Sequence, residues 1–270
     1  MRDSLGDSFT GQYHAFLQSL MFYSRIRVPA GANHSEASMR NATVWLPVVG
    51  WIVGGVCAVV TWGVLHVWGV GVSVLIGTVG GLWLTGAIHE DGLGDVCDGF
   101  GGGFTAERTL QIMKDSSVGV FGALGVAIAV VLKVSLITDI IGHSGGRFRW
   151  GQGLLVLPVA HAMSRAAAVG LMGTHQYVGG LTSKAQPMTQ RLSPLLMSVV
   201  MATGVLPLVV FSASWWMLAV LPAVAITWFM MGRWMHKRIG GYTGDCLGAI
   251  QQVTELVVYL TVAAVWRWHG

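Results

Sequence analysis

Four of the twelve acidic residues in this 270-residue chain lie within nine positions. Residues 89–99 read HEDGLGDVCDG and contain Glu90, Asp91, Asp95 and Asp98. The spacing of the three aspartates places their carboxylates about one turn apart on one face of a helix. Carboxylates stacked in this way repel one another, so the pattern predicts a compensating cation. Mg²⁺, with Mn²⁺ as an alternative, is a hard ion that takes such oxygen ligands together with substrate phosphates.

A second polar segment, residues 108–119, reads RTLQIMKDSSVG. Lys114 can neutralise a phosphate as a point charge, and Asp115 can bind a metal ion or orient Lys114. Ser116 and Ser117 can cap the helix that follows. The alternative interpretation of the whole segment is a basic loop that ends in a helix cap.

Other polar residues lie in or beside apolar segments. Arg165 lies inside one, where a charged residue is a functional candidate by default; a guanidinium that reaches the lipid headgroups is the alternative. His161 precedes it by one helical turn on the same face. Asp245 enters the last apolar segment, and Glu255, deeper in that segment, is expected to pair with a buried cation. His89 is either structural or a ligand beside the acidic residues.

The composition indicates an integral membrane protein. Hydrophobic residues make up 53% of the chain and charged residues only 10%, whereas soluble proteins carry about 25% charged residues. Lipid must therefore be the solvent for much of the surface. We expect one membrane domain spanning residues 1–270. Its polar site, rich in carboxylates, cations and glycines, would suit a pyrophosphate substrate.

Seven apolar segments are long enough to cross a bilayer. They lie at about residues 43–62, 67–88, 118–141, 151–173, 192–211, 213–231 and 247–266. The fifth and sixth segments are separated so narrowly that they can also form one broken hairpin. Before them, residues 13–30 combine aromatic side chains with Arg25 and Arg27, which predicts an interfacial or re-entrant helix that is too polar to span. The expected fold class is all-α and polytopic, with an N-terminal interfacial segment.

The basic residues follow the positive-inside rule. With the N-terminus in the cytoplasm, eleven fall on the cytoplasmic side and three on the other. The eleven are Arg2, Arg25, Arg27, Arg40, Arg108, Lys114, Lys184, Arg191, Arg233, Lys237 and Arg238. The three are Arg147, Arg149 and Arg267. This bias predicts a multi-pass protein of the cytoplasmic (inner) membrane whose acidic segment faces the cytoplasm. Because the basic residues are spread among loops, the net charge of +4 does not indicate nucleic-acid binding.

Residues 89–125 read HEDGLGDVCDGFGGGFTAERTLQIMKDSSVGVFGALG. They resemble the central signature of the cobalamin-5′-phosphate synthase family, H-x-D-G-L-A-D-x-x-D-G followed by I-M-[KR]-D-S-x-x-G-x-x-G. The sequence departs from it at Gly94, where alanine is usual. The similarity extends to residues 45–55 (WLPVVGWIVGG) and 243–249 (TGDCLGA). Residues 25–29 (RIRVP) also resemble the start of the family pattern, R-x-P-x-P, but Arg27 stands where proline is expected.

The resemblance implies a Mg²⁺-dependent transferase. It would join adenosylcobinamide-GDP to α-ribazole or its 5′-phosphate, release GMP and complete the nucleotide loop of vitamin B12. The expected metal ligands are Asp91, Asp95 and Asp98. The expected catalytic residues are Asp98, Asp115, Lys114 and Arg165. The expected substrate-binding residues are His89, Lys114, Ser116, Arg165 and Asp245.

In this scheme Lys114 and Arg165 offset charge on the transferred phosphoryl group and on GMP. Either Asp98 or Asp115 accepts the proton of the attacking ribose hydroxyl. Three alternatives remain open at this stage: a CDP-alcohol phosphotransferase, an intramembrane prenyltransferase and a transporter that uses the acidic residues as a cation or proton site. The sequence also leaves the oligomeric state open.

Overall fold

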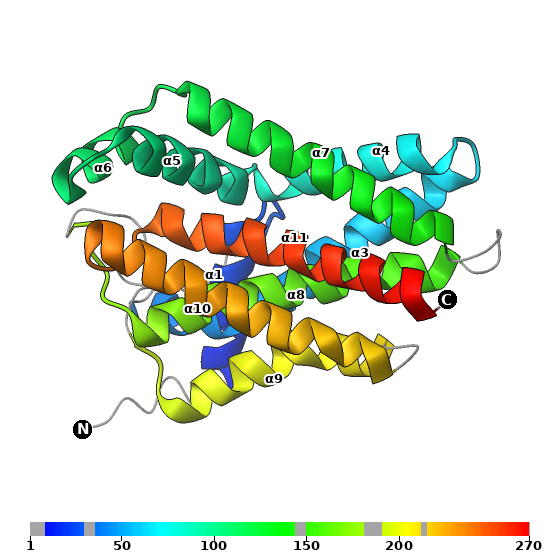
Figure 1. Ribbon diagram of the computed structural model, residues 1–270. Coiled ribbons are helices and arrows are strands. Elements are labelled where there is room, and N and C mark those ends of the chain that lie inside the picture. The colour runs from blue at the N-terminus through cyan, green and yellow to red at the C-terminus, as the bar shows by residue number, and fades with distance from the viewer. Residues whose placement is uncertain (1–8, 30–35, 144–149, 181–190, 212–214, 270) are drawn as a thin grey trace.

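The computed structural model describes residues 9–29, 36–143, 150–180, 191–211 and 215–269, and these form a bundle of α-helices (Figure 1). The only strand-like pairing within these ranges is an isolated bridge between Tyr177 and Tyr242. The α-helices are α1 (Phe9–Tyr23), α2 (Glu36–Ala42), α3 (Leu46–Leu65), α4 (Val70–Thr85), α5 (Ile88–Gly102), α6 (Ala106–Met113), α7 (Val120–His143), α8 (Trp150–Thr174), α9 (Pro194–Phe211), α10 (Val220–Ile239) and α11 (Gly244–His269). The 3₁₀ turns are η1 (Thr43–Trp45) and η3 (Trp215–Ala219). The predicted all-α class is confirmed.

In the described part of the chain, six helical segments are long and apolar enough to cross a membrane. They are Ser38–Leu65, Val120–His143, Gly151–Thr174, Pro194–Phe211, Trp215–Ile239 and Gly244–Trp268. A seventh crossing exists if α4 and α5 form one broken span. This agrees with the prediction of a polytopic protein with about seven spans. The two segments on either side of residues 212–214 are each long and apolar enough to cross alone.

The second predicted span, residues 67–88, is interrupted by a sharp bend. The axes of α4 and α5 differ by 88°. Gly86 (φ 67°) and Ala87 (φ 56°) both adopt the left-handed conformation, which ends a helix and is uncommon for alanine. The backbone amide of Arg25 donates to the carbonyl oxygen of Leu84 at 2.7 Å, just before the bend. The acidic segment therefore begins a separate helix.

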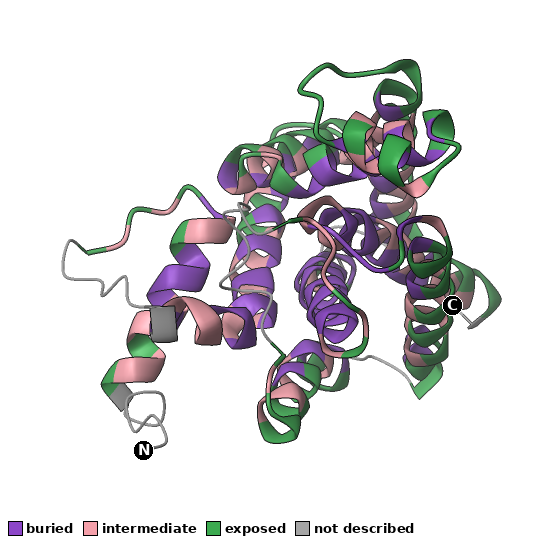
Figure 2. Ribbon diagram, turned by 90° about the vertical axis from the view of Figure 1, so that its left-hand side faces the viewer, coloured by how far each residue is buried: buried purple, intermediate pink, exposed green. Residues whose placement is uncertain are grey.

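The central helix of the bundle is α8, and 94% of its apolar stretch is buried. It packs against α3, α9 and α11, and Figure 2 shows the buried helices at the centre of the bundle. Glycine permits a close approach of α3 to α8, since a Cβ atom at Gly54 would lie 2.6 Å from the Cα atom of Pro158. This packing carries Arg165 into the interior, where its side chain is 1% exposed.

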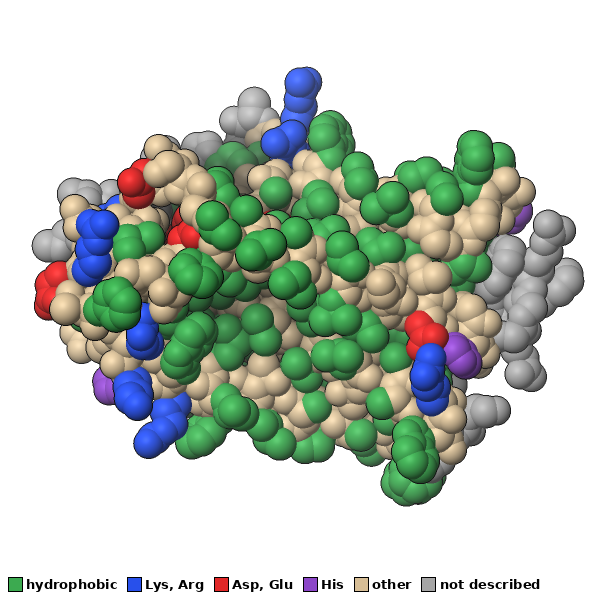
Figure 3. Space-filling view, turned by 45° about the horizontal axis from the view of Figure 1, so that its top comes forward, with side chains coloured by type: hydrophobic (Ala, Val, Ile, Leu, Met, Phe, Trp, Pro, Cys, Tyr) green, Lys and Arg blue, Asp and Glu red, His purple; other side chains and the backbone are tan. Residues whose placement is uncertain are grey.

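The outer surface is apolar over the middle of the molecule. Hydrophobic side chains cover the centre of the face in Figure 3, and charged side chains lie mostly toward the two ends. Trp83 on α4, Val131 on α7 and Phe229 on α10 are examples of exposed large apolar residues. Such a belt is expected where lipid is the solvent.

The predicted N-terminal interfacial segment, residues 13–30, overlaps α1. This 15-residue helix is not among the candidate spans. It packs against α2 and α3. Its position at the membrane interface stays a prediction.

Candidate active site

The three aspartates of the acidic segment lie on the regular helix α5, as their spacing predicts. The side chain of Asp91 is exposed, whereas Asp95 and Asp98 are half-buried. The described residues contain no group of three His, Cys, Asp or Glu side chains arranged to hold a metal ion. Metal binding by Asp91, Asp95 and Asp98 therefore stays a prediction.

The carboxylate of Asp98 has a structural partner that the sequence did not reveal. Its Oδ2 atom accepts a hydrogen bond from the backbone amide of Gly119 at 2.7 Å, and Oδ1 accepts one from Gly122 at 2.8 Å. Amides in the first turn of a helix have no partner within the helix. Asp98 therefore caps α7, a function that we had expected of Ser116 or Ser117.

The last helix, α11, crosses α5 at two glycines. A Cβ atom at Gly92 would lie 2.8 Å from the carbonyl oxygen of Asp245, and one at Gly248 would lie 3.0 Å from the carbonyl oxygen of His89. A side chain at Gly92 would therefore push the two helices apart, and one at Gly248 would meet a tight backbone contact. The crossing brings Asp245 beside the acidic face of α5, as the prediction of one shared site requires.

A pocket of about 230 Å³ opens at this crossing. Its polar lining includes Asp91, Asp245, His89 and Arg165, from α5, α11 and α8. Its apolar lining includes Phe22, Tyr23, Leu46, Ala168 and Met172. The His89 ring is buried and stacks on Tyr23, with ring centroids 6.2 Å apart. The pocket therefore gathers five predicted site features into one place: two carboxylates, a guanidinium, an imidazole and close glycine backbone.

The second motif is not part of this pocket lining. Lys114, Asp115 and Ser116 lie in the exposed connection between α6 and α7. Asp115 accepts hydrogen bonds from the hydroxyl of Ser117 at 2.6 Å and from its amide at 3.0 Å. These bonds lower the pKa of the Asp115 carboxyl below its usual value, which makes it a weaker proton acceptor. The cap on Gly119 ties this connection to α5. The roles of Lys114 and Ser116 stay predictions.

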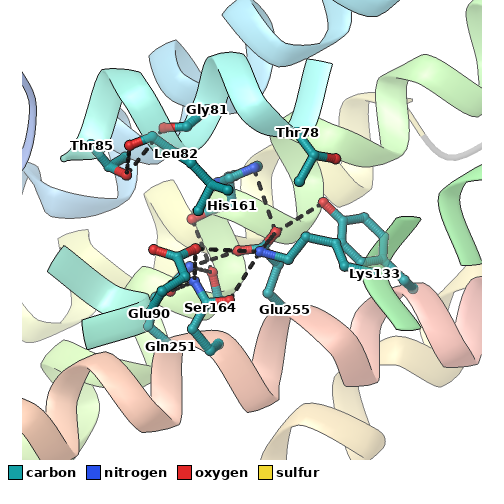
Figure 4. Close-up of polar contacts among 12 residues, drawn as sticks. Thr78, Gly81, Leu82, Thr85, Glu90, Lys133, His161, Ser164, Gln251 and Glu255 are labelled. Carbon is teal, nitrogen blue, oxygen red and sulfur yellow. Dashed lines mark hydrogen bonds and ion pairs between the residues drawn. The ribbon is translucent and has the colours of Figure 1, made fainter. Parts of the chain in front are cut away.

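A second polar cluster lies deeper, where α5, α7, α8 and α11 meet. Figure 4 shows Glu255 at its centre. The Oε1 atom of Glu255 lies 3.1 Å from Nζ of Lys133 and 3.5 Å from Nε2 of His161. Lys133 also lies 3.7 Å from Glu90 and donates to Gln252 at 2.9 Å. The expected pairing of Glu255 with a buried cation is confirmed. The sequence did not show which cation this is.

Arg165 connects the buried cluster to the pocket. Its NH1 group donates to the carbonyl oxygen of His161 at 3.0 Å and lies 3.0 Å from Nδ1 of the same residue. This contact makes Nδ1 the acceptor and leaves Nε2–H directed at Glu255. Because the Arg165 side chain is buried, the alternative in which it reaches lipid headgroups is wrong. The guanidinium instead contacts His161 of the cluster and also lines the pocket.

Arg238 is a further residue that the sequence analysis missed. Its NH2 group donates to the carbonyl oxygens of Phe100 at 2.7 Å and Gly103 at 2.6 Å. These carbonyls lie at the C-terminal end of α5, where a cation is favourable. The one sequence feature that could have indicated this contact is the run of basic residues at the end of α10. The positive-inside rule also explains that run.

Comparisons with known proteins point to one protein family along almost the whole chain. The sequence model of the cobalamin-5-phosphate synthase family matches residues 15–263. A protein of Ralstonia pickettii named adenosylcobinamide-GDP ribazoletransferase is 43% identical over 251 residues, covering 91% of this chain and 93% of the relative. Proteins of the same name are 36% identical in Shewanella amazonensis (96% and 98% covered) and in Vibrio cholerae (94% of each). No solved structure matches this one.

The helical bundle and its pocket define a polytopic membrane protein with carboxylates and a guanidinium facing one space. The chain belongs to the cobalamin-5-phosphate synthase family, and it is a transferase of the cobalamin pathway. The resemblance of residues 89–125 is thereby confirmed. Family membership also decides against the CDP-alcohol phosphotransferase, the prenyltransferase and the transporter.

Proposed function

We propose that this chain joins adenosylcobinamide-GDP to α-ribazole or α-ribazole 5′-phosphate. The names of the Ralstonia, Shewanella and Vibrio relatives support these substrates. The ribose hydroxyl attacks the phosphorus linked to cobinamide, a new phosphodiester forms, and the bond to GMP breaks. The product is adenosylcobalamin or its 5′-phosphate, and the reaction is the last assembly step of the B12 nucleotide loop.

One observation carries this proposal. Asp91, Asp245 and Arg165 come from three different helices and line the same 230 Å³ pocket. A pyrophosphate needs positive charge on its oxygens, and a guanidinium supplies it through paired hydrogen bonds. The carboxylates cannot bind such an anion directly, so their presence beside Arg165 indicates a cation shared with the substrate.

The chemistry of these carboxylates fits a divalent cation, because hard oxygen ligands are those that Mg²⁺ takes. Asp91, Asp95 and Asp245 would hold it. Asp98 is assigned instead to positioning α7, since both of its oxygens accept backbone hydrogen bonds. When bound, Mg²⁺ supplies charge stabilisation to the phosphate oxygens and orients the leaving group.

The chain's own groups account for the remaining steps. Arg165 binds the phosphoryl oxygens and offsets the charge that develops on them. The carboxylate oxygen of Asp95 that does not bind the cation accepts the hydroxyl proton. No described residue donates a hydrogen bond to Asp95, whereas Asp98 and Asp115 are already hydrogen-bonded acceptors. Stacking on Tyr23 fixes the His89 ring at the edge of the pocket, where it contacts substrate.

We also propose that the protein lies in the cytoplasmic membrane with the pocket open to the cytoplasm. The distribution of basic residues supports this orientation. Arg2, Arg147, Arg149 and Lys184 of that distribution lie outside the described residues.

The test is GMP release by the purified protein in proteoliposomes, with adenosylcobinamide-GDP and α-ribazole 5′-phosphate supplied together or singly. We expect GMP and a cobalamin product in equal amounts, only with both substrates and Mg²⁺ present. GMP release without ribazole phosphate would indicate hydrolysis, and no release from folded protein would refute the proposed substrates.

A further inference from the structure

We propose that a groove between α8, α9 and α10 binds the acyl chain of an anionic phospholipid, with the headgroup beside Trp228 and Thr174. The groove encloses about 530 Å³, more than twice the 230 Å³ of the pocket that holds Arg165. None of its lining residues lines that pocket. It is therefore a separate site, and the inference does not rest on the proposed reaction.

Small side chains on α8 form the floor of the groove. They are Ala166, Ala167, Gly170 and Gly173. Met197, Met201 and Val205 of α9 form one wall, and Leu221, Val224 and Trp228 of α10 form the other. Side chains of this kind offer a flexible apolar ligand dispersion contacts but almost no hydrogen bonds.

The groove opens to lipid and has the length of one leaflet. All three helices are candidate membrane spans. Along α9 the lining runs from Pro194 to Val205, a distance of about 16 Å at 1.5 Å per residue. Half of a bilayer's hydrocarbon core is about 15 Å thick. A single acyl chain from one leaflet fits this length.

Polar groups gather at only one end of the groove. The indole N–H of Trp228 is buried and has no hydrogen-bond partner among the described residues. The His175 ring lies beyond it, with centroids 6.4 Å from Trp228 and 6.3 Å from His236. Arg191 is exposed just before the lining residue Leu192. A donor and a guanidinium with two imidazoles complement a phosphate, so this end selects an anionic headgroup.

The opposite end of the groove is apolar, which fixes the direction of the lipid. Gly204, Val205 and Leu221 line it. Phosphate placed there would lose its water without gaining a donor. The chain terminus therefore lies near Leu221 and the headgroup near Trp228.

The experiment measures lipid bound to the full chain, without reference to turnover. Protein purified in a mild detergent is analysed by native mass spectrometry after exchange with vesicles containing phosphatidylglycerol or phosphatidylcholine. A phosphatidylglycerol with a photoreactive group in its acyl chain then maps the contact by peptide sequencing. We expect retained phosphatidylglycerol and cross-links concentrated on the lining residues of α8, α9 and α10.

Variants that fill the groove should release the lipid. Ala167→Phe and Val205→Trp each place a large ring in it, and we expect retention to fall by about tenfold. Val209→Trp is the matched control, because Val209 lies on α9 outside the groove and is 61% exposed. Trp228→Phe keeps the apolar bulk but removes the N–H, so it should reduce the preference for phosphatidylglycerol over phosphatidylcholine.

Three results would overturn the inference. They are unchanged retention in folded Ala167→Phe and Val205→Trp proteins, cross-links spread evenly over every lipid-facing helix, and cross-links through the groove between two copies of the chain. If Ala167→Phe fails to fold, Val205→Trp and the cross-link map of the unmodified protein decide the question.

Discussion

Asp98 and Gly119 form a hydrogen bond in which the carboxylate Oδ2 accepts from the backbone amide at 2.7 Å. The bond joins two helices that are separated in sequence by α6. It also places the negative charge of Asp98 at the positive end of α7, where it is stabilising. The end of the acidic helix is thereby fixed to the start of a membrane span, which keeps Asp91 and Asp95 in register with the rest of the bundle.

Replacement of this carboxylate should affect stability as well as activity. In Asp98→Asn the side-chain NH₂ group faces one of the two amides, so one hydrogen bond is lost, and we expect a loss of about 1–3 kcal/mol in the free energy of unfolding. Asp91→Asn is the matched variant: its side chain is exposed, so the free energy of unfolding should change by less than about 0.5 kcal/mol. Unfolding in detergent–denaturant mixtures measures both. Equal stability of the two variants would contradict the capping role.

Gly92 and Gly94 of the acidic segment should respond differently to alanine. A Cβ atom at Gly92 meets the backbone of Asp245 at 2.8 Å, so Gly92→Ala must separate α5 from α11. Misplacing Asp245 in this way should lower the GMP release rate by about 10–100-fold. At Gly94 the nearest atom is Val126 Cγ2 at 3.5 Å, an ordinary contact. Gly94→Ala should therefore keep full activity and gain up to about 1 kcal/mol in helix stability. Full activity in Gly92→Ala would show that the crossing does not position the site.

The buried ion pair should be far more sensitive than an exposed one. Glu255→Gln leaves the Lys133 ammonium without its nearest carboxylate, and we expect a loss of about 3–5 kcal/mol in the free energy of unfolding. The control is Arg267→Gln, which breaks an exposed pair with Asp139 and should lose no more than about 1 kcal/mol. The additional change Lys133→Met should restore part of the stability lost in Glu255→Gln. A Glu255→Gln protein as stable as Arg267→Gln would contradict the importance of the cluster.

The membrane spans could be predicted because lipid imposes length and apolarity on each crossing segment. The bend between α4 and α5 could not. Ala87 carries no local signal for a left-handed conformation, and the contact between Arg25 and Leu84 beside the bend joins residues far apart in sequence. A hydropathy pattern cannot show where tertiary contacts override helix propensity.

In the site, too, local features could be predicted from the sequence, whereas contacts between distant residues could not. The shared face of Asp91, Asp95 and Asp98 followed from helical spacing alone. The capping of α7 by Asp98 could not be predicted, because its partners are backbone amides that have no side-chain signature. Similarly, the sequence did not identify Lys133 as the cation that pairs with Glu255, since this pairing depends on how α7 meets α11.

The central claim is that the pocket shared by Asp91, Asp245 and Arg165 performs the transfer. Its most direct test is the GMP release rate of Asp245→Asn. The control is Asp139→Asn, the same acid-to-amide change near the end of α7 and outside the pocket lining. We predict that Asp245→Asn folds normally yet loses at least about a hundredfold in rate, because losing a ligand weakens charge stabilisation worth several kcal/mol. Asp139→Asn should keep full turnover. Near-normal turnover in Asp245→Asn would contradict the assignment of this pocket as the active site.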